Sequence, residues 1–238
     1  KMADLFSRKP ESVRPPLISL ANGITLSSAV QSLNQIANRH QPEIVVLHSH
    51  SSSSPHLQMT GLGSFSELAV STSKYPVMVI SEVTQVPNQI RRILFPTDFD
   101  ASRKKAFLKA VEWARRFDAT MILFHEKTMP MGPAMYAGAG LLADSSLMAA
   151  VWEEQDNLVR RESQNWLQEA KASGVACEVL VEDRIGTWGE QINDIVKSYK
   201  IDLLVVNTRR VPWSHVFLER KVRHLFSETP CPLILIHS

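Results

Sequence analysis

Continuous apolar runs of strand length constrain this chain more than any other feature. Four of them show no alternation of polar and apolar residues, and two more follow prolines. A strand that is apolar on both faces needs cover on both faces, as in a parallel sheet between helices. We therefore expect strands at 43–48, 92–97, 120–126, 202–207, 76–81 and 232–238, with weaker strands at 15–21 and 176–182.

Apolar residues at helical spacing lie between these runs. Clear stripes follow residue 104, residue 187 and residue 217. Alternating strands and helices predict βαβ units with right-handed crossovers, and therefore an α/β fold. Residues 127–143, rich in Met, Gly, Ala and Pro, interrupt this alternation before a helix that we expect at about 144–172. A loop of this length is either a lid or partner surface or a plain connection.

The chain contains an internal repeat. Aligning Glu43 with Asp202 places "EIVVLHSHS" on "DLLVVNTRR". The same alignment places Leu33 on Ile192 without gaps, and "KYPVMVIS" meets "PCPLILIH" after small gaps. We predict two domains, residues 1–85 and 86–238, of which the first lacks the first strand, first helix and second strand of the second. Whether these elements are truncated, unseen or degenerate stays open at this point.

Composition excludes several classes of protein. The net charge is only +2, so the chain as a whole is not a nucleic-acid or membrane binder by charge. No apolar run approaches the roughly 20 residues of a membrane span, and the N-terminus has no signal-peptide core. Two cysteines make no disulfide framework, which favours a reducing cytoplasm. We expect Cys177 and Cys231 to be buried thiols that act as small hydrophobes.

Several segments together resemble the universal stress protein family. "RRILFPTDFDASRKKAFLKAVEWARRFDATMILFHE" resembles the opening of such domains, an I-L-x-P-x-D strand, an Ala-rich helix and a second strand ending in His. "DLLVVNTRR" with "CPLILIHS", and "EIVVLHSHSSSSPHLQMTGLGSFSE" with "YPVMVI", resemble the closing unit. The resemblance implies two flavodoxin-like, Rossmann-like parallel sheets of strand order 3-2-1-4-5. It also implies that the two repeats pack as a pseudo-dimer through their last strands, with a homodimer as a further association.

The resemblance also implies a nucleotide site. ATP-binding members carry Gly-x-x-Gly, nine residues, then Gly-Ser or Gly-Thr, and an aspartate after the first strand contacts the nucleoside. The glycines let the backbone approach phosphate oxygens, and free N–H groups at a helix N-terminus favour anions. The second repeat keeps the nucleoside half as Pro96, Thr97 and Asp98. Its phosphate positions keep their spacing without any glycine; they are Asn207, Arg210, Arg220 and Lys221.

The first repeat shows the reverse pattern. Gly63 and Ser64 survive in "LGSFSE", whereas the upstream positions are His48 and Ser51 and the first-strand aspartate is absent from the chain. Neither repeat therefore carries a complete family nucleotide site. The basic residues of the second repeat form either an anion site or a solvated surface. An anion site is plausible chemically because the planar guanidinium of arginine can donate two parallel hydrogen bonds to a phosphate. These residues are Arg209, Arg210, Arg220, Lys221 and Arg223.

Other polar residues give weaker indications of function. Asp98 is either a nucleoside contact or a capping residue of the turn that follows its strand. The loop with His48, His50 and His56 has no cysteine or carboxylate to complete a metal site, so we expect no metal. His125 ends a strand without a paired nucleophile, and we expect it to be structural.

We therefore expect a cytoplasmic, stress-response-type tandem protein that does not bind ATP in the family manner. It acts as a binding or regulatory module and not as an enzyme, with weak ATP hydrolysis kept as an alternative. No cofactor, membrane or nucleic-acid partner is expected, and no protein partner is identified. One alternative is an ATP or AMP binder with a rewritten basic loop of Arg210, Arg220 and Lys221. Another is an anion- or nucleic-acid-responsive module.

Overall fold

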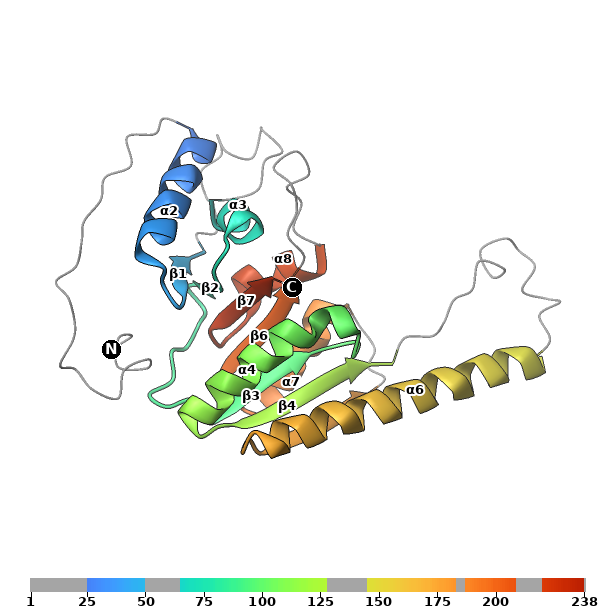
Figure 1. Cartoon of the computed structure of the whole chain (residues 1–238). Helices are drawn as coiled ribbons and strands as arrows, with labels where there is room; N and C mark the ends of the chain where they lie inside the picture. The colour runs from blue at the N-terminus through green and yellow to red at the C-terminus, as the bar shows by residue number, and fades with distance from the viewer. Residues whose placement is uncertain (1–24, 50–64, 128–144, 183–186, 209–219, 238) are drawn as a thin grey trace.

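Within the described residues, seven strands form one mostly parallel sheet with helices on both faces. In a computed structural model of the chain, the described residues are 25–49, 65–127, 145–182, 187–208 and 220–237, with the backbone alone at 145–149, 151–152, 220–221 and 223–224. The strands are β1 (Val45–His48), β2 (Val77–Ile80), β3 (Arg92–Pro96), β4 (Thr120–Glu126), β5 (Cys177–Glu182), β6 (Leu203–Thr208) and β7 (Leu233–His237). Their order across the sheet is β1-β2-β7-β6-β3-β4-β5 (Figure 1).

The five strands of the second repeat have the order that the resemblance implied. Numbered within the repeat, β5-β4-β3-β6-β7 is 3-2-1-4-5, and every neighbouring pair is parallel. All six residues of β6 are buried, because this strand lies between β3 and β7 with helices on both faces. The continuous apolar runs therefore predicted this sheet correctly.

The two repeats join through their last strands. β2 pairs with β7 in antiparallel register, with Val77 opposite Leu235 and Val79 opposite Leu233. The resemblance implied that the last strands of the two repeats pair edge to edge, and this pairing joins both repeats in one continuous sheet. The pairing covers one edge of each repeat, which removes two exposed strand edges at once. The Ser49 hydroxyl also donates to the carbonyl oxygen of Phe226 at 2.6 Å, across the same junction.

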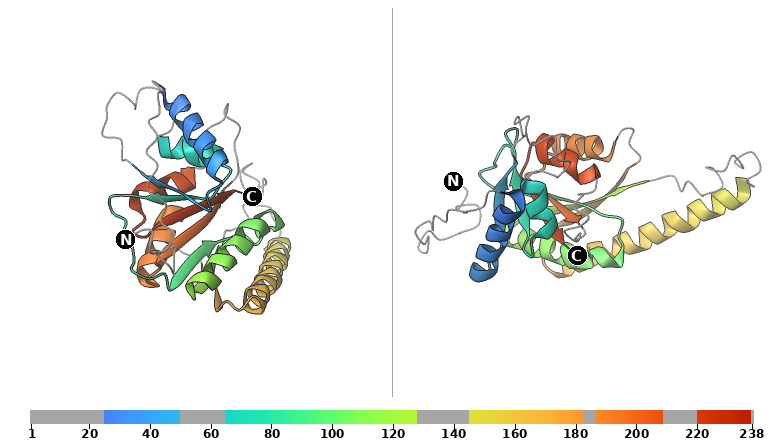
Figure 2. Two further views of the ribbon diagram at one scale, coloured as in Figure 1. Left: turned by 60° about the vertical axis from the view of Figure 1, so that its left-hand side comes forward. Right: turned by 90° about the horizontal axis from the view of Figure 1, so that it is seen from above.

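Helices cover the sheet in two layers (Figure 2). α4 (Lys104–Phe117) and α6 (Ser145–Ala172) pack on the face that carries Ile93 and Phe95. α7 (Trp188–Ser198) and α8 (Arg220–Glu228) pack on the opposite face with Leu94. Successive strand residues point to opposite faces, so one apolar run supplies both cores. A 3₁₀ turn, η3 (Ala101–Arg103), precedes α4.

The helices of the first repeat are α2 (Leu26–His40) and α3 (Phe65–Thr72). α2 begins at a capping box in which the Thr25 side chain accepts from the Ser28 N–H, and α7 begins at the equivalent box of Thr187 and Glu190. Such reciprocal bonds satisfy donors that a helix N-terminus leaves without intrahelical partners. The two repeats thus start corresponding helices with the same device.

Several further expectations can be compared with the structure. α6 begins and ends within one residue of the helix expected at 144–172. The strand expected at 15–21 and the loop residues 128–143 lie outside the described residues. Cys177 and Cys231 are both buried and free, as expected, and burial raises their pKa to about 11 and about 12. In the described part of the chain, no helix combines the length and apolar character that crossing a bilayer requires.

Candidate functional site

A crevice opens where the carboxyl ends of β3, β4 and β6 meet. In open α/β sheets this edge is the usual position of ligands, because the loops that follow parallel strands converge there. The crevice has a volume of about 240 Å³. Its polar lining comes from Thr97, Asp98, Arg103, His125, Glu126 and Asn207, and its apolar lining from Pro96, Phe124, Trp188, Val206 and Val222.

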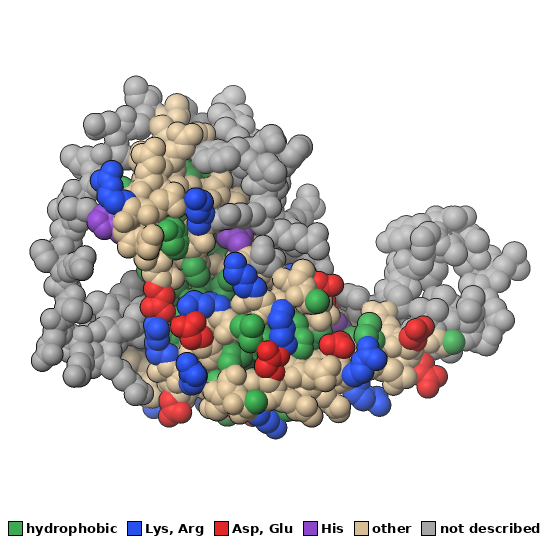
Figure 3. Space-filling model, viewed as in Figure 1, with side chains coloured by type: hydrophobic (Ala, Val, Ile, Leu, Met, Phe, Trp, Pro, Cys, Tyr) green, Lys and Arg blue, Asp and Glu red, His purple; other side chains and the backbone are tan. Residues whose placement is uncertain are grey.

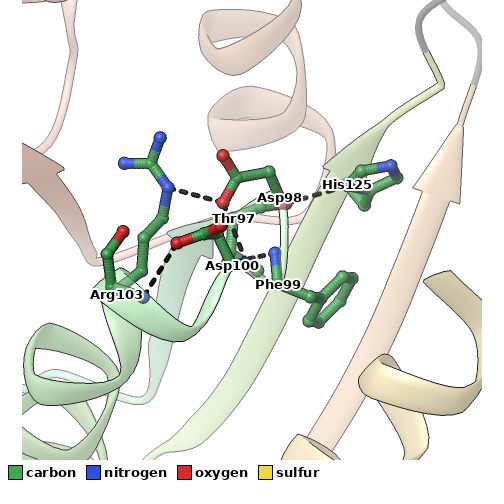
Figure 4. A network of polar contacts seen from close by, with 7 residues as sticks. Thr97, Asp98, Phe99, Asp100, Arg103 and His125 are labelled. Carbon is green, nitrogen blue, oxygen red and sulfur yellow. Dashed lines mark hydrogen bonds and ion pairs between the residues drawn. The ribbon is translucent and has the colours of Figure 1, made fainter. Parts of the chain in front are cut away.

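The turn after β3 is built from short side-chain to backbone hydrogen bonds (Figure 4). The Thr97 hydroxyl accepts from the Phe99 N–H at 2.9 Å, and Asp98 Oδ1 accepts from the Asp100 N–H at 3.2 Å. Asp100 then caps η3 by accepting from the Ser102 N–H at 2.8 Å. Each bond replaces a backbone partner that the chain loses when it leaves the strand.

Phe99 turns the chain at this point. Its φ is +59°, a value that few bulky residues adopt, and such a conformation costs on the order of 1–3 kcal/mol. The ring is buried, with its centroid 5.5 Å from that of Trp166 and 5.6 Å from that of His125. Aromatic packing offsets the strain, and the turn places Phe99 in the core while Asp98 reaches the crevice.

Arg103 connects two walls of the crevice. Its Nε donates to Asp98 Oδ1 at 2.5 Å. With the Asn207 amide oriented to satisfy both of its polar atoms, Asn207 Oδ1 accepts from Arg103 Nη1 at 3.0 Å and Nδ2 donates to the Ile236 carbonyl oxygen at 3.2 Å. One guanidinium therefore links the end of β3 to the end of β6. Its side chain is 24% exposed, so the contacts are partly sheltered from water.

The pKa of the Asp98 carboxyl lies below its usual value. Burial alone would raise this pKa, but the hydrogen bonds from the Arg103 side chain and the Asp100 N–H favour the charged form and outweigh burial. Asp98 is therefore a carboxylate at neutral pH, and one of its oxygens already accepts two hydrogen bonds within the chain.

His125 and Glu126 hold the wall formed by β4. The His125 Nδ1 lies 3.0 Å from the carbonyl oxygen of Thr97, which fits a ring that donates from Nδ1. Glu126 Oε1 accepts from the Gln191 side chain of α7 at 2.9 Å. His125 thus has the structural contacts that we expected of it, fixing the turn after β3 against β4.

The structure places some of the predicted site residues together and leaves others undescribed. Pro96, Thr97, Asp98 and Asn207 line one crevice. The predicted residues Arg210, Gly63 and Ser64 lie outside the described residues, as do His50 and His56. Arg220 and Lys221 form the start of α8, which borders the crevice through Val222, but their side chains lie outside the description. Among described residues, no three His, Cys, Asp or Glu side chains gather in a metal-binding cluster.

Arg103 is the crevice residue that the sequence analysis missed. It lies five residues after Asp98, inside the segment that resembles the family opening, but at none of the family's nucleotide-site positions. The available signal was its position: a residue in the first helical turn after a parallel strand lies at the ligand edge of the sheet. A basic residue there is close enough to pair with an aspartate that ends the strand.

A parallel sheet of this order, with a crevice at its carboxyl edge and a partial second copy joined through the last strands, defines a tandem flavodoxin-like α/β protein. The sequence model of the universal stress protein family matches residues 89–237, which is more than half of the chain. The chain belongs to the universal stress protein family.

Solved structures show the same fold. A universal stress protein from Archaeoglobus fulgidus matches with a TM-score of 0.58 and 17% identity, covering 87% of this chain and 64% of its own. A functionally unknown protein from Pseudomonas aeruginosa matches with a TM-score of 0.56 and 12% identity, covering 87% of this chain and 67% of its own. At such identities the likeness concerns the fold alone. No curated protein matches this chain.

Proposed function

We propose that this chain is a binding or regulatory module of the universal stress type that does not hold ATP in the family manner and does not turn it over. The observation that carries this proposal is the Arg103 bridge between Asp98 and Asn207. These two residues mark the nucleoside half and the first phosphate position. A nucleotide that occupied both the nucleoside half and the phosphate half of the site would have to displace the Arg103 guanidinium, which already bonds to Asp98 and Asn207.

Two further features support the proposal. The glycines that would let a backbone approach phosphate are replaced at all three positions of the second repeat, so main-chain contacts are harder to form there. The crevice of about 240 Å³ is also smaller than the roughly 300–1,000 Å³ of most small-molecule sites. Its polar groups are engaged with one another, and a ligand would have to replace those bonds.

A titration with ATP and with AMP, followed by thermal unfolding, tests the proposal. Ligand at about one hundred times its dissociation constant adds about 2.7 kcal/mol to the stability of the folded state, which is a visible shift. We expect no shift at millimolar nucleotide. A saturable shift that Asp98→Ala abolishes would overturn the proposal, and so would ATP turnover that the same variant abolishes.

Variants then separate the two causes of lost binding. Arg103→Met removes the bridge but keeps an unbranched side chain, and Arg115→Met, on the exposed surface of α4, is the matched control. If Arg103→Met alone gains ATP binding, the bridge excludes the nucleotide. If binding appears only after Arg220→Gly and Lys221→Ser are added, the missing glycines are the larger cause. Gain in Arg115→Met as well would mean that charge in general, and not the bridge, controls binding.

A second candidate function is an adenine-nucleotide binder with a rewritten basic grip. The specific observation in its favour is that Arg103 lies in the crevice and that α8 begins beside it, since a guanidinium and a helix N-terminus both favour phosphate. In that case ATP would stabilise the wild-type protein, and Arg103→Met would weaken its binding. The same titration thus distinguishes the two functions by the sign of the Arg103 effect.

A further inference from the structure

A second and larger hollow lies between the start of α4 and the middle of α6. It has a volume of about 1050 Å³, and we call it the α6 groove. Phe99, Val159 and Trp166 contribute apolar floor, while Asp98 and His125 separate it from the crevice by lining both. Figure 4 shows the Phe99 ring turned away from Arg103. The turn after β3 therefore lines both hollows.

One wall of the α6 groove is an open stripe of α6. Its lining residues run from Glu154 to Trp166, a stretch of about 18 Å at 1.5 Å per residue, or just over three helical turns. Leu158, near the middle of this stripe, is 50% exposed. The N-terminal half of α6 extends past the sheet (Figure 1), which explains why the stripe is not buried in the core.

The rim of the α6 groove is acidic. Four carboxylates line it against one lysine, Lys104, which pairs with Glu169. Asp98 pairs with Arg103 and Glu162 pairs with the exposed Arg161, so Asp100 and Glu154 are the two lining carboxylates that these ion pairs do not involve. The chain as a whole has a net charge of +2, and Figure 3 shows side chains of both signs interspersed over the face of α4 and α6. The acidity is therefore a local property of the groove.

Lys104 illustrates the chemistry that this region accommodates. Its Nζ lies 5.0 Å from the ring centroids of both Phe107 and Trp166. A cation is thus stabilised by aromatic faces and a carboxylate together. A partner with apolar groups flanked by ammonium or guanidinium groups would extend the same arrangement along the groove.

We propose that the α6 groove docks a basic amphipathic helix from a partner protein. The apolar face of that helix lies on Leu158 and Val159. Its Lys or Arg residues pair with Glu154 and replace the exposed Arg161 at Glu162. A groove about three turns long matches recognition through apolar anchors at helical spacing. An anionic membrane surface would be repelled by the same rim. The inference goes beyond the proposed function and does not depend on whether the crevice binds nucleotide.

A labelled model peptide tests this proposal by fluorescence anisotropy. The probe is a synthetic helix of about 18 residues with leucines on one face and lysines on the flanks. The comparison peptides are its scrambled sequence and a version with glutamates in place of the lysines. We expect the amphipathic basic peptide to bind the full chain saturably, and both comparison peptides to bind at least about tenfold more weakly.

Matched variants locate the binding. Leu158→Ala and Glu154→Lys should each weaken the amphipathic peptide about tenfold. Leu108→Ala changes another exposed leucine, and Glu153→Lys changes the neighbouring exposed glutamate outside the groove, so both should bind as the wild type does. Equal effects in groove and control variants would overturn the proposal. So would equal binding of the scrambled peptide, or no saturable binding at all.

Discussion

Val46 and Val205 occupy matching positions in the two repeats, yet Val46 is 43% exposed and Val205 is completely buried. The strands that carry them have nearly the same apolar sequence. β6 is buried at every residue, whereas the residues of β1 alternate between intermediate and exposed. The same pattern therefore gives a fully covered strand in one repeat and a half-covered strand in the other.

The neighbours of the two strands explain the difference. β6 lies between β3 and β7, while among the described strands β1 pairs only with β2. The helices differ between the repeats in the same way as the strands. Ile192 of α7 is fully buried, whereas its counterpart in α2, Leu33, is only partly buried in a small cluster with Val30 and Leu68. A continuous apolar run indicates that a strand can be buried on both faces. The neighbouring strands and helices determine how much of the strand is actually buried.

The first repeat consequently depends on the second for part of its stability. The β2–β7 pairing, the Ser49 bond to Phe226 and the ion pair of Glu43 with Arg116 all cross from one repeat to the other. A sheet that continues through the junction predicts one cooperative unfolding transition, because neither repeat can lose its last strand without exposing the edge of the other.

The largest contrast is expected between matching helix positions. Ile192→Ala removes a fully buried side chain from between α7 and the sheet, and we expect it to lower the free energy of unfolding by about 3 kcal/mol. Leu33→Ala, in the small cluster under α2, should cost about 1 kcal/mol. Urea unfolding followed by circular dichroism measures both values.

This pair of variants also tests the cooperativity of the sheet. If the repeats unfold together, both variants shift one transition. A separate early transition that only Leu33→Ala shifts would show that the first repeat unfolds on its own, and the dependence inferred from the junction would be wrong. Equal costs at the two positions would contradict the burial difference itself.

A smaller contrast is expected between the matching strand positions. Val205→Ala leaves a space in a covered strand, and we expect a loss of about 2 kcal/mol of stability. Val46→Ala removes a half-exposed side chain, and its effect should be below about 0.5 kcal/mol. The chemical change is identical, so the difference in urea midpoints reports the environment alone. A cost at Val46 close to that at Val205 would mean that β1 is covered in solution.

Much of the fold was predictable because the apolar runs are long and unbroken. The strand expected at 120–126 is β4 to the residue, and α6 begins one residue after its predicted start. The joining of the two sheets through their last strands was expected from the family resemblance alone. It depends on the register of β2 against β7, a contact between segments more than 150 residues apart that no local pattern specifies.

The sequence predicted those residues of the candidate site that lie at the ends of strands. Thr97, Asp98 and Asn207 come together because each ends or follows a parallel strand, and such ends share one edge of a sheet. Arg103 was missed because its position depends on the left-handed conformation of Phe99, which Trp166 and His125 stabilise from distant parts of the chain. The signal that the sequence offered for Arg103 was its position shortly after a parallel strand.

The smallest effect that we predict concerns two carboxylate–arginine pairs, one between the repeats and one within the crevice. The hydrogen bond from Arg116 lowers the pKa of Glu43, partly opposed by burial, and the Asp98 pKa is lowered as described above. Because both folded-state pKa values lie below the unfolded ones, the stabilisation is complete above the ordinary carboxyl pKa of about 4 and is lost as the pH falls through the folded value.

Glu43→Gln and Asp98→Asn should therefore lower stability at about pH 6 and lower it less at about pH 3, because the stabilisation by the wild-type carboxylates is lost as the pH falls through their lowered pKa values. Both side chains are substantially exposed, at 43% and 51%, so screening by water limits each effect to about 0.5 kcal/mol. Urea midpoints at the two pH values measure the difference, with Glu153→Gln as the control for removing one charge. If Glu43→Gln matches that control at both pH values, the Glu43–Arg116 pair adds nothing to the junction. The β2–β7 strand pairing and hydrogen bonds such as that of Ser49 with Phe226 would then hold the two repeats together.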